Sequence, residues 1–162
     1  MGFYAAYHQD RRNKATHFIG VPAIMLSLFI PLAWLQLEVG GMRLTAAMLF
    51  AAIVLAYYFL LDAPLAFAML LFTGLLVYVA DRIAAQGAAA GWAWCGALFV
   101  GGWILQLVGH AFEGRKPALV SNLFQIFVAP IFLCAEVFFA LGYKPRLHTA
   151  MQERALRMRA AS

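Results

Sequence analysis

Two side chains of one short stretch, His110 and Glu113, are the first candidates for chemistry in this sequence. They stand three positions apart in residues 109–119 (GHAFEGRKPAL), directly after a long apolar run. Positions i and i+3 share one face of a helix, so an imidazole and a carboxylate can point at one place. Neutral imidazole is the commonest biological metal ligand. The spacing therefore indicates a candidate metal site at the edge of an apolar segment.

Two further histidines, His8 and His17, precede the first apolar run. Nine steps of roughly 100° place them on opposite faces of any continuous helix, so the chain must turn between them if both serve one site. Asp10, Asn13 and Thr16 are all suitable N-cap residues. We therefore expect a short helix, a turn over residues 10–13 and a new helix that begins near Thr16.

The composition excludes a soluble domain. The chain has 162 residues, of which 65% are hydrophobic and 12% charged, whereas about a quarter of a soluble domain is charged. Apolar runs of roughly 17 to 20 residues recur, and each is long enough as a helix to cross about 30 Å of hydrocarbon. We predict an all-α polytopic helical bundle that forms a single integral membrane domain over residues 1–162.

Four runs are predicted to cross the membrane, at residues 18–37, 44–61, 65–80 and 91–108. Residues 38–43 are expected to form a turn, and Asp62 to Pro64 a tight reversal that makes a helical hairpin. Asp62 and Asp81 are interpreted as cap or turn residues. The first run is followed by further spans and lacks a small-residue cleavage site, so we expect a retained anchor. Cys95 and Cys134 lie inside apolar runs without a CxxC spacing and are expected to be small core residues.

A fifth apolar run, at residues 119–141, contains Asn122, Gln125, Pro130 and Glu136. We expect a Pro-broken re-entrant segment, with a true fifth span as the alternative. In the tail, residues 142–162, one helical face carries Leu147, Met151, Ala155 and Met158, with Arg154, Arg157 and Arg159 around it. This pattern predicts an amphipathic helix on anionic lipid, with His148 as a surface residue.

The net charge of +5 comes from twelve basic and seven acidic residues, and the basic residues flank the first and last apolar runs. This placement is typical of membrane orientation and not of nucleic-acid binding. It puts the N-terminal segment, residues 1–17, in the cytoplasm, and four crossings then return the chain to that side. His8, His17 and His110 are thus expected on the cytoplasmic side. The Ala-rich composition suggests a bacterial inner membrane.

Three histidines, alone or with a carboxylate, leave open positions on iron or zinc for substrate and dioxygen or water. Glu113 is interpreted as a ligand, as an acceptor that orients His110, or as the partner of Arg115 or Lys116. Gln106 shares the face of His110 four residues earlier and is either a hydrogen-bond donor to substrate or a contact between helices.

These motifs together resemble those of the membrane 2-hydroxy fatty acid dioxygenases, typified by the fungal enzyme of phytosphingosine breakdown. The resemblance spans nearly the whole chain. It is carried by Tyr7-His8, Asn13, His17, Val21-Pro22, Gln106, Gly109-His110, Phe112-Glu113, Pro117-Ala118-Leu119, Asn122-Leu123, Gln125, Ala129-Pro130, Glu136, Leu141-Gly142-Tyr143 and Pro145-Arg146-Leu147.

The resemblance implies an Fe(II)-dependent α-oxidation in which a 2-hydroxy fatty acid reacts with dioxygen and loses one carbon. It assigns His8, His17 and His110 as iron ligands, and leaves out His148. From their position beside His110, Glu113 and Gln106 are the expected catalytic residues. The expected substrate-binding residues, chosen for their charge or polarity, are Arg12, Arg115, Lys116 and Asn122. Asp81 falls at an acidic position of the family but on the far side of the membrane from this site.

Two other classes of function stay open at this point. A zinc-dependent membrane hydrolase would use the same three ligands with a metal-bound water. A transporter or scaffold would need the histidines for structure alone. The expected partners are substrate, dioxygen and membrane lipids, and the oligomeric state is left open.

Overall fold

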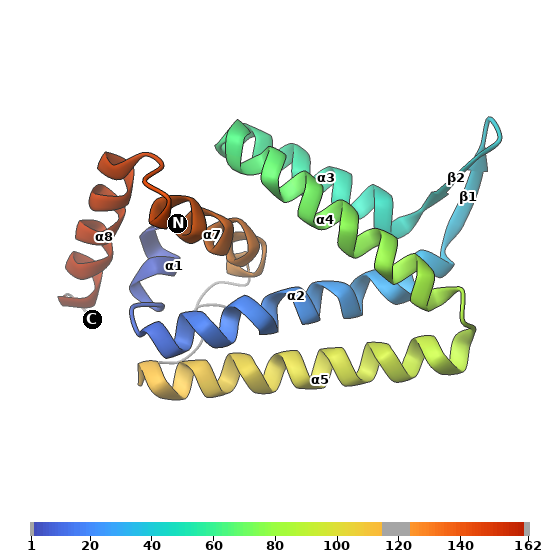
Figure 1. Cartoon of the computed structure of the whole chain (residues 1–162), viewed down its shortest axis with the longest axis horizontal. Helices are drawn as coiled ribbons and strands as arrows, with labels where there is room; N and C mark the ends of the chain where they lie inside the picture. The colour runs from blue at the N-terminus through green and yellow to red at the C-terminus, as the bar shows by residue number, and fades with distance from the viewer. Residues whose placement is uncertain (1, 115–123, 161–162) are drawn as a thin grey trace. The chain divides into compact units, whose positions relative to one another are not determined.

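The computed structural model describes residues 2–114 and 124–160, and within them it is helical apart from one small β-hairpin (Figure 1). The all-α prediction is confirmed. Contacts divide the chain into two compact units, Met1–Ile19 with Ile104–Ser162, and Gly20–Trp103. The helices are α1 (Gly2–Ala6), α2 (Arg11–Trp34), α3 (Ala46–Leu61), α4 (Ala63–Ala84), α5 (Ala88–Glu113), α7 (Gln125–Ala140) and α8 (Pro145–Ala160), and the strands are β1 (Gln36–Val39) and β2 (Met42–Thr45).

Three of the described helices are long and apolar enough to cross a membrane: α2, α4 and α5, with 24, 22 and 26 residues. At about 1.5 Å per residue they exceed the roughly 30 Å of a hydrocarbon core. These helices correspond to three of the four predicted spans. The predicted second span, at residues 44–61, is the shorter helix α3 of 16 residues, about 24 Å long. It is shorter because Leu44 and Thr45 belong to β2.

The predicted turn at residues 38–43 is instead a two-stranded antiparallel hairpin formed by β1 and β2. Gly40 and Gly41 both have positive φ angles, of 60° and 79°, which suits the two-residue turns of tight hairpins. Arg43 on β2 donates to Asp81 on α4 over 2.5 Å. Asp81 therefore has an ion-pair partner in the unit Gly20–Trp103 and is more than a cap residue.

The helical hairpin of α3 and α4 forms as predicted, and the two helices pack along each other. The reversal is capped by Asp62, whose Oδ1 accepts a hydrogen bond from the backbone N of Leu65 at 3.3 Å. In the same unit, α2 and α5 approach closely at Gly102, where a Cβ atom would lie 3.0 Å from the carbonyl oxygen of Gly20. A glycine allows this contact because it presents no side chain.

The fifth apolar run does not turn back at Pro130, so the re-entrant break expected there is wrong. Helix α7 continues through Pro130 from Gln125 to Ala140. Proline in a helix removes one backbone hydrogen bond and leaves one carbonyl without its usual partner, which neighbouring groups can satisfy inside a membrane protein. The earlier part of this run, residues 119–123, lies outside the described residues.

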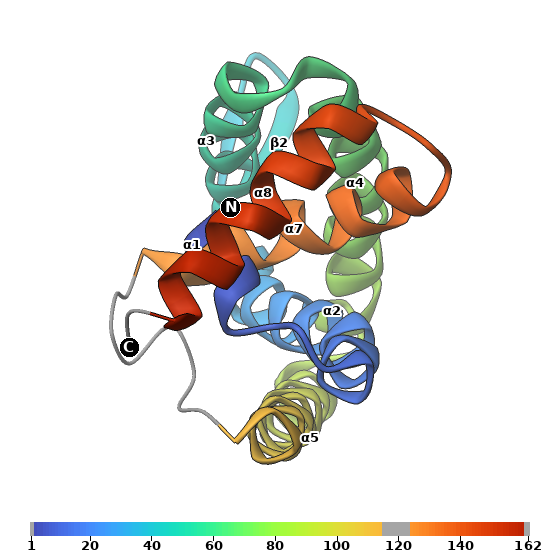
Figure 2. The same ribbon diagram turned by 90° about the vertical axis from the view of Figure 1, so that its left-hand side faces the viewer.

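The last helix, α8, packs on α1, and both views of the molecule show the two side by side (Figures 1 and 2). Met151 and Ala155 are buried, whereas Leu147 and Leu156 are exposed. The helix is present as predicted, but the centre of its predicted lipid-facing side contacts protein. The reason is that α1, from the other end of the chain, packs against this side of α8. The sequence pattern of α8 alone does not reveal that partner.

Candidate metal centre

A turn between α1 and α2 brings His8 back towards His17. Helix α1 ends at Ala6 and α2 begins at Arg11, so the turn covers residues 7–10 instead of 10–13. Of the three candidate caps, Asp10 is the one that precedes the helix, and its Oδ1 accepts a hydrogen bond from the backbone N of Arg12 at 2.7 Å. The reversal lets two histidines nine residues apart face each other.

The structure brings together the three histidines that the sequence singled out. His8, His17 and His110 are buried, with 1%, 1% and 5% of their surface exposed. One ring nitrogen from each lies within 4.8 Å of the others, and the described residues contain no other such group of histidine, cysteine or acidic side chains. They come from the α1–α2 turn, from α2 and from the last turn of α5.

Backbone carbonyls define the protonation of two of these rings. His8 Nδ1 lies 2.8 Å from the carbonyl oxygen of Tyr4, and His17 Nδ1 lies 2.9 Å from that of Asn13. A carbonyl oxygen only accepts, so each Nδ1 carries the proton and each Nε2 carries a lone pair. This arrangement is the usual one around a metal-binding histidine.

The two Nε2 atoms of His8 and His17 lie 3.0 Å apart. Two lone pairs at that distance repel each other unless a positive charge is shared between them. A proton is a poor source of that charge, because burial, and then the nearby His17, lowers the pKa of His8 to about 2. His110 adds a buried Nδ1 that has no hydrogen-bond partner among the described residues. The donor set therefore fits a metal cation.

Gly109 allows the third histidine to reach the site. A Cβ atom at this position would lie 3.2 Å from His17 Nδ1 and closer still to Asn13 Oδ1 and Thr16 Oγ1. Contacts of this kind are shorter than real side chains tolerate, so any larger residue would push α5 away from α2. The absent side chain therefore sets the approach of His110 to His17.

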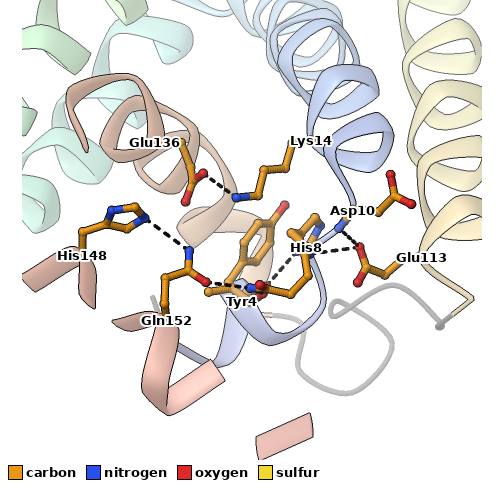
Figure 3. A network of polar contacts seen from close by, with 10 residues as sticks. Tyr4, His8, Asp10, Lys14, Glu113, Glu136, His148 and Gln152 are labelled. Atoms are coloured by element: carbon orange, nitrogen blue, oxygen red, sulfur yellow. Dashed lines mark hydrogen bonds and ion pairs between the residues drawn. The ribbon is translucent and has the colours of Figure 1, made fainter. Parts of the chain in front are cut away.

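Glu113 holds the turn that carries His8. Its Oε2 accepts a hydrogen bond from the backbone N of Asp10 at 2.8 Å (Figure 3). It also accepts from the backbone N of Gln9 at 3.0 Å and from Asn13 Nδ2 at 3.2 Å. A carboxylate at this place also suits the positive end of α2. Of the roles left open for Glu113, the described contacts favour a positioning role, directed at the turn.

Two more of the predicted site residues differ in their burial. Gln106 is buried, and its Nε2 has no hydrogen-bond partner among the described residues, as expected of a donor reserved for a ligand. Arg12 is exposed: its Nη2 pairs with Asp10 at 3.0 Å, and its guanidinium lies 4.6 Å from the centre of the Phe112 ring. Arg115, Lys116 and Asn122 lie outside the described residues.

Aromatic rings that the sequence did not single out line the site. Tyr4 stacks on His8 with 3.9 Å between ring centres and 7° between the ring planes. Phe132 on α7 contacts both, with its ring centre 4.8 Å from that of Tyr4 and 6.0 Å from that of His8. The four-residue spacing of Tyr4 and His8 was the only available signal. His148, in contrast, stacks on Phe139, apart from the three-histidine group.

Comparison with known proteins agrees with this geometry. A family model described as 2-hydroxy-palmitic acid dioxygenase Mpo1-like matches residues 1–141. This chain belongs to the Mpo1-like family. It is 35% identical over 159 residues to the 2-hydroxy-palmitic acid dioxygenase MPO1 of Saccharomyces cerevisiae, covering 94% of this chain and 85% of the relative. No solved structure matches.

All three histidines, Gln106 and Glu113 lie within the matched residues, whereas α8 lies beyond them. The Mpo1-like match thus covers the candidate metal centre completely. It makes the chain a member of a dioxygenase family with apolar membrane helices.

Proposed function

We propose that this protein is an Fe(II)-dependent dioxygenase that shortens 2-hydroxy fatty acids by one carbon. The observation that carries the proposal is the convergence of three buried imidazoles, two with Nε2 lone pairs 3.0 Å apart, in a chain of the Mpo1-like family. The yeast relative, a 2-hydroxy-palmitic acid dioxygenase, supplies the substrate class.

His8, His17 and His110 would hold the metal, and Fe(II) when bound supplies open coordination positions at which a 2-hydroxy acid and dioxygen can meet. The carbonyl groups of Tyr4 and Asn13 keep the first two imidazoles neutral and oriented. Gln106 donates from Nε2 to a substrate oxygen. Burial of the three rings keeps bulk water away from the reacting group.

The substrate's acyl tail suits the apolar surroundings of a membrane protein. Each CH₂ group removed from water contributes about 0.8 kcal/mol to binding, so a long chain favours the membrane side of the site. The bond that breaks joins C1 and C2, which leaves the chain one carbon shorter. The basic residues beside α2 and in α8 favour an inner-membrane protein with this site on the cytoplasmic side.

Metal analysis of detergent-purified protein tests the metal centre. We expect about one iron per chain, lost in His8→Gln, His17→Gln and His110→Gln and retained in the matched control His148→Gln. Metal that persists in all three single variants would show that other residues bind it.

Oxygen uptake tests the reaction. The iron-loaded protein is expected to consume oxygen with 2-hydroxypalmitate and not with palmitate, because the 2-hydroxyl oxygen, which palmitate lacks, is needed at the site beside the carboxylate. An iron-loaded protein that consumes no oxygen with any 2-hydroxy acyl chain would contradict the proposal. Zinc as the only metal, with turnover in the absence of oxygen, would favour a hydrolase.

A further inference from the structure

A second polar feature in the same unit is the ion pair of Lys14 on α2 and Glu136 on α7. Lys14 Nζ lies 2.5 Å from Glu136 Oε2, and the two side chains are only 20% and 13% exposed. The other carboxylate oxygen, Glu136 Oε1, is buried and has no hydrogen-bond partner among the described residues. In the part of the chain that the structure describes, only one of the two carboxylate oxygens of Glu136 is therefore bonded.

This pair adjoins the candidate metal centre. Lys14 stands three residues before His17 and so neighbours it on the surface of α2. Glu136 stands one helical turn after Phe132, whose ring contacts that of His8. Figure 3 shows Lys14 and Glu136 reaching towards each other beside the side chains of Tyr4 and His8.

A purely structural role, in which the ion pair only stabilises the packing of α2 on α7, explains this arrangement less well. A buried ion pair stabilises a fold weakly unless hydrogen bonds satisfy its remaining atoms, and Glu136 Oε1 is not so satisfied in the part of the chain that the structure describes. The Lys14 ammonium group has three donors, of which the structure describes one as bonded. Arg12, the residue of this segment that was expected to bind the substrate carboxylate, is bonded to Asp10 at the surface.

We infer that Lys14 is the specificity-determining residue that binds the carboxylate of the substrate, and that Glu136 holds the Lys14 side chain beside the metal centre until substrate arrives. This inference rests on the proposed function for the identity of the substrate. One carboxylate oxygen can then face the three histidines while the other accepts from Lys14 Nζ. Such a charge-assisted hydrogen bond selects the carboxylate over neutral chains that carry oxygen at the same two carbons, C1 and C2.

Binding measured without oxygen tests this inference. The protein is loaded with Fe(II) under argon, and Kd is measured for 2-hydroxypalmitate and for hexadecane-1,2-diol, a neutral chain of equal length. Lys14→Gln is expected to raise the Kd of the acid at least about tenfold, the loss typical of a hydrogen bond to a charged group, and to change the Kd of the diol less than about twofold.

Glu136→Gln distinguishes this role from a structural one. Removing the competing negative charge is expected to lower the Kd of the acid, in the direction opposite to Lys14→Gln. Lys144→Gln, at an exposed lysine of the segment before α8, is the matched control and should leave both constants unchanged.

Three outcomes would overturn the inference. In the first, Lys14→Gln weakens the binding of acid and diol equally; in the second, Glu136→Gln weakens the binding of the acid and both variants have a lower Tm. In the third, the parent protein does not bind the acid. The proposed function fails separately. A parent that binds the acid through Lys14 but consumes no oxygen would refute the oxygenase activity and retain the carboxylate site. A parent that consumes oxygen with a Kd insensitive to Lys14→Gln would refute the carboxylate site alone.

Discussion

At the scale of single residues, Gly109 shows how an absent side chain supports a candidate metal centre. Its backbone lies so close to Asn13 and Thr16 that a Cβ atom would overlap them. His110, the next residue, can approach His17 only because of this contact. A methyl group at position 109 should therefore weaken metal binding as well as the packing of the helices.

We expect Gly109→Ala to lower the free energy of unfolding by about 1–3 kcal/mol, the usual cost of an overpacked contact, and to reduce the iron content of the purified protein. Gly101→Ala on the same helix is the control, because a Cβ atom there meets nothing within 4 Å. Thermal unfolding and metal analysis in detergent measure both effects. Equal behaviour of the two variants would show that the close approach is unimportant.

Glu113 acts at the same scale through charge. Glu113→Gln keeps the shape of the side chain but weakens its hydrogen bonds to the backbone N of Gln9 and Asp10. Mutation of groups that orient metal ligands typically lowers the metal affinity about 10–100-fold. We therefore expect Glu113→Gln to lower the iron affinity by about that factor, measured in a competition with a chelator. Glu153→Gln, at an exposed residue of α8, should have no effect, and an unchanged affinity in Glu113→Gln would exclude the positioning role.

At the scale of elements, α8 covers α1, the helix that precedes His8. Met151 and Ala155 are buried, with 6% and 0% of their surface exposed, and Gln152 Oε1 accepts a hydrogen bond from Gln9 Nε2 at 3.1 Å. The contact explains why an amphipathic helix with basic residues packs on protein. It also ties the end of the chain to the turn that carries His8.

We expect Met151→Asp to detach α8 from α1, because burying an unpaired charge costs several kcal/mol. Trypsin should then cleave after Arg154 and Arg157 faster than in the parent protein. Leu156→Asp is the control, since Leu156 is on the same helix and 58% exposed. Equal cleavage rates in the two variants would mean that the α1–α8 contact does not protect the helix.

At the scale of the whole molecule, all three histidines belong to the unit Met1–Ile19 with Ile104–Ser162. A bound metal stabilises the folded state of the segments that hold it. Removal of the metal should therefore loosen this unit and leave the unit Gly20–Trp103 little changed. The two units thus differ in their expected response to chelators.

Hydrogen exchange measured by mass spectrometry checks this expectation. After removal of the metal in detergent, peptides of the three-histidine unit should exchange faster, and peptides of α3 and α4 should keep their protection. Addition of Fe(II) should restore the slow exchange, and the triple variant His8→Gln, His17→Gln, His110→Gln serves as a control that no longer responds. A uniform change across both units would contradict the expectation.

The sequence by itself determined the class of the protein and the composition of its candidate metal centre. Long apolar runs predict membrane helices, because the length of a run relative to the bilayer is a local property of the chain. The need for a turn between His8 and His17 followed from helix geometry, and Asp10 was already among its possible caps. The family resemblance then joined these local signals into one expected site.

Only the tertiary structure decided which faces meet. Residues 36–45 form a β-hairpin where only a turn at residues 38–43 was expected, α7 passes through Pro130, and α8 packs on α1. Glu113 bonds to backbone amides, which leave no mark in a sequence, and Lys14 pairs with Glu136 from 122 residues away. Each of these contacts depends on two segments far apart in the chain, and local hydropathy and spacing carry no information about such pairs.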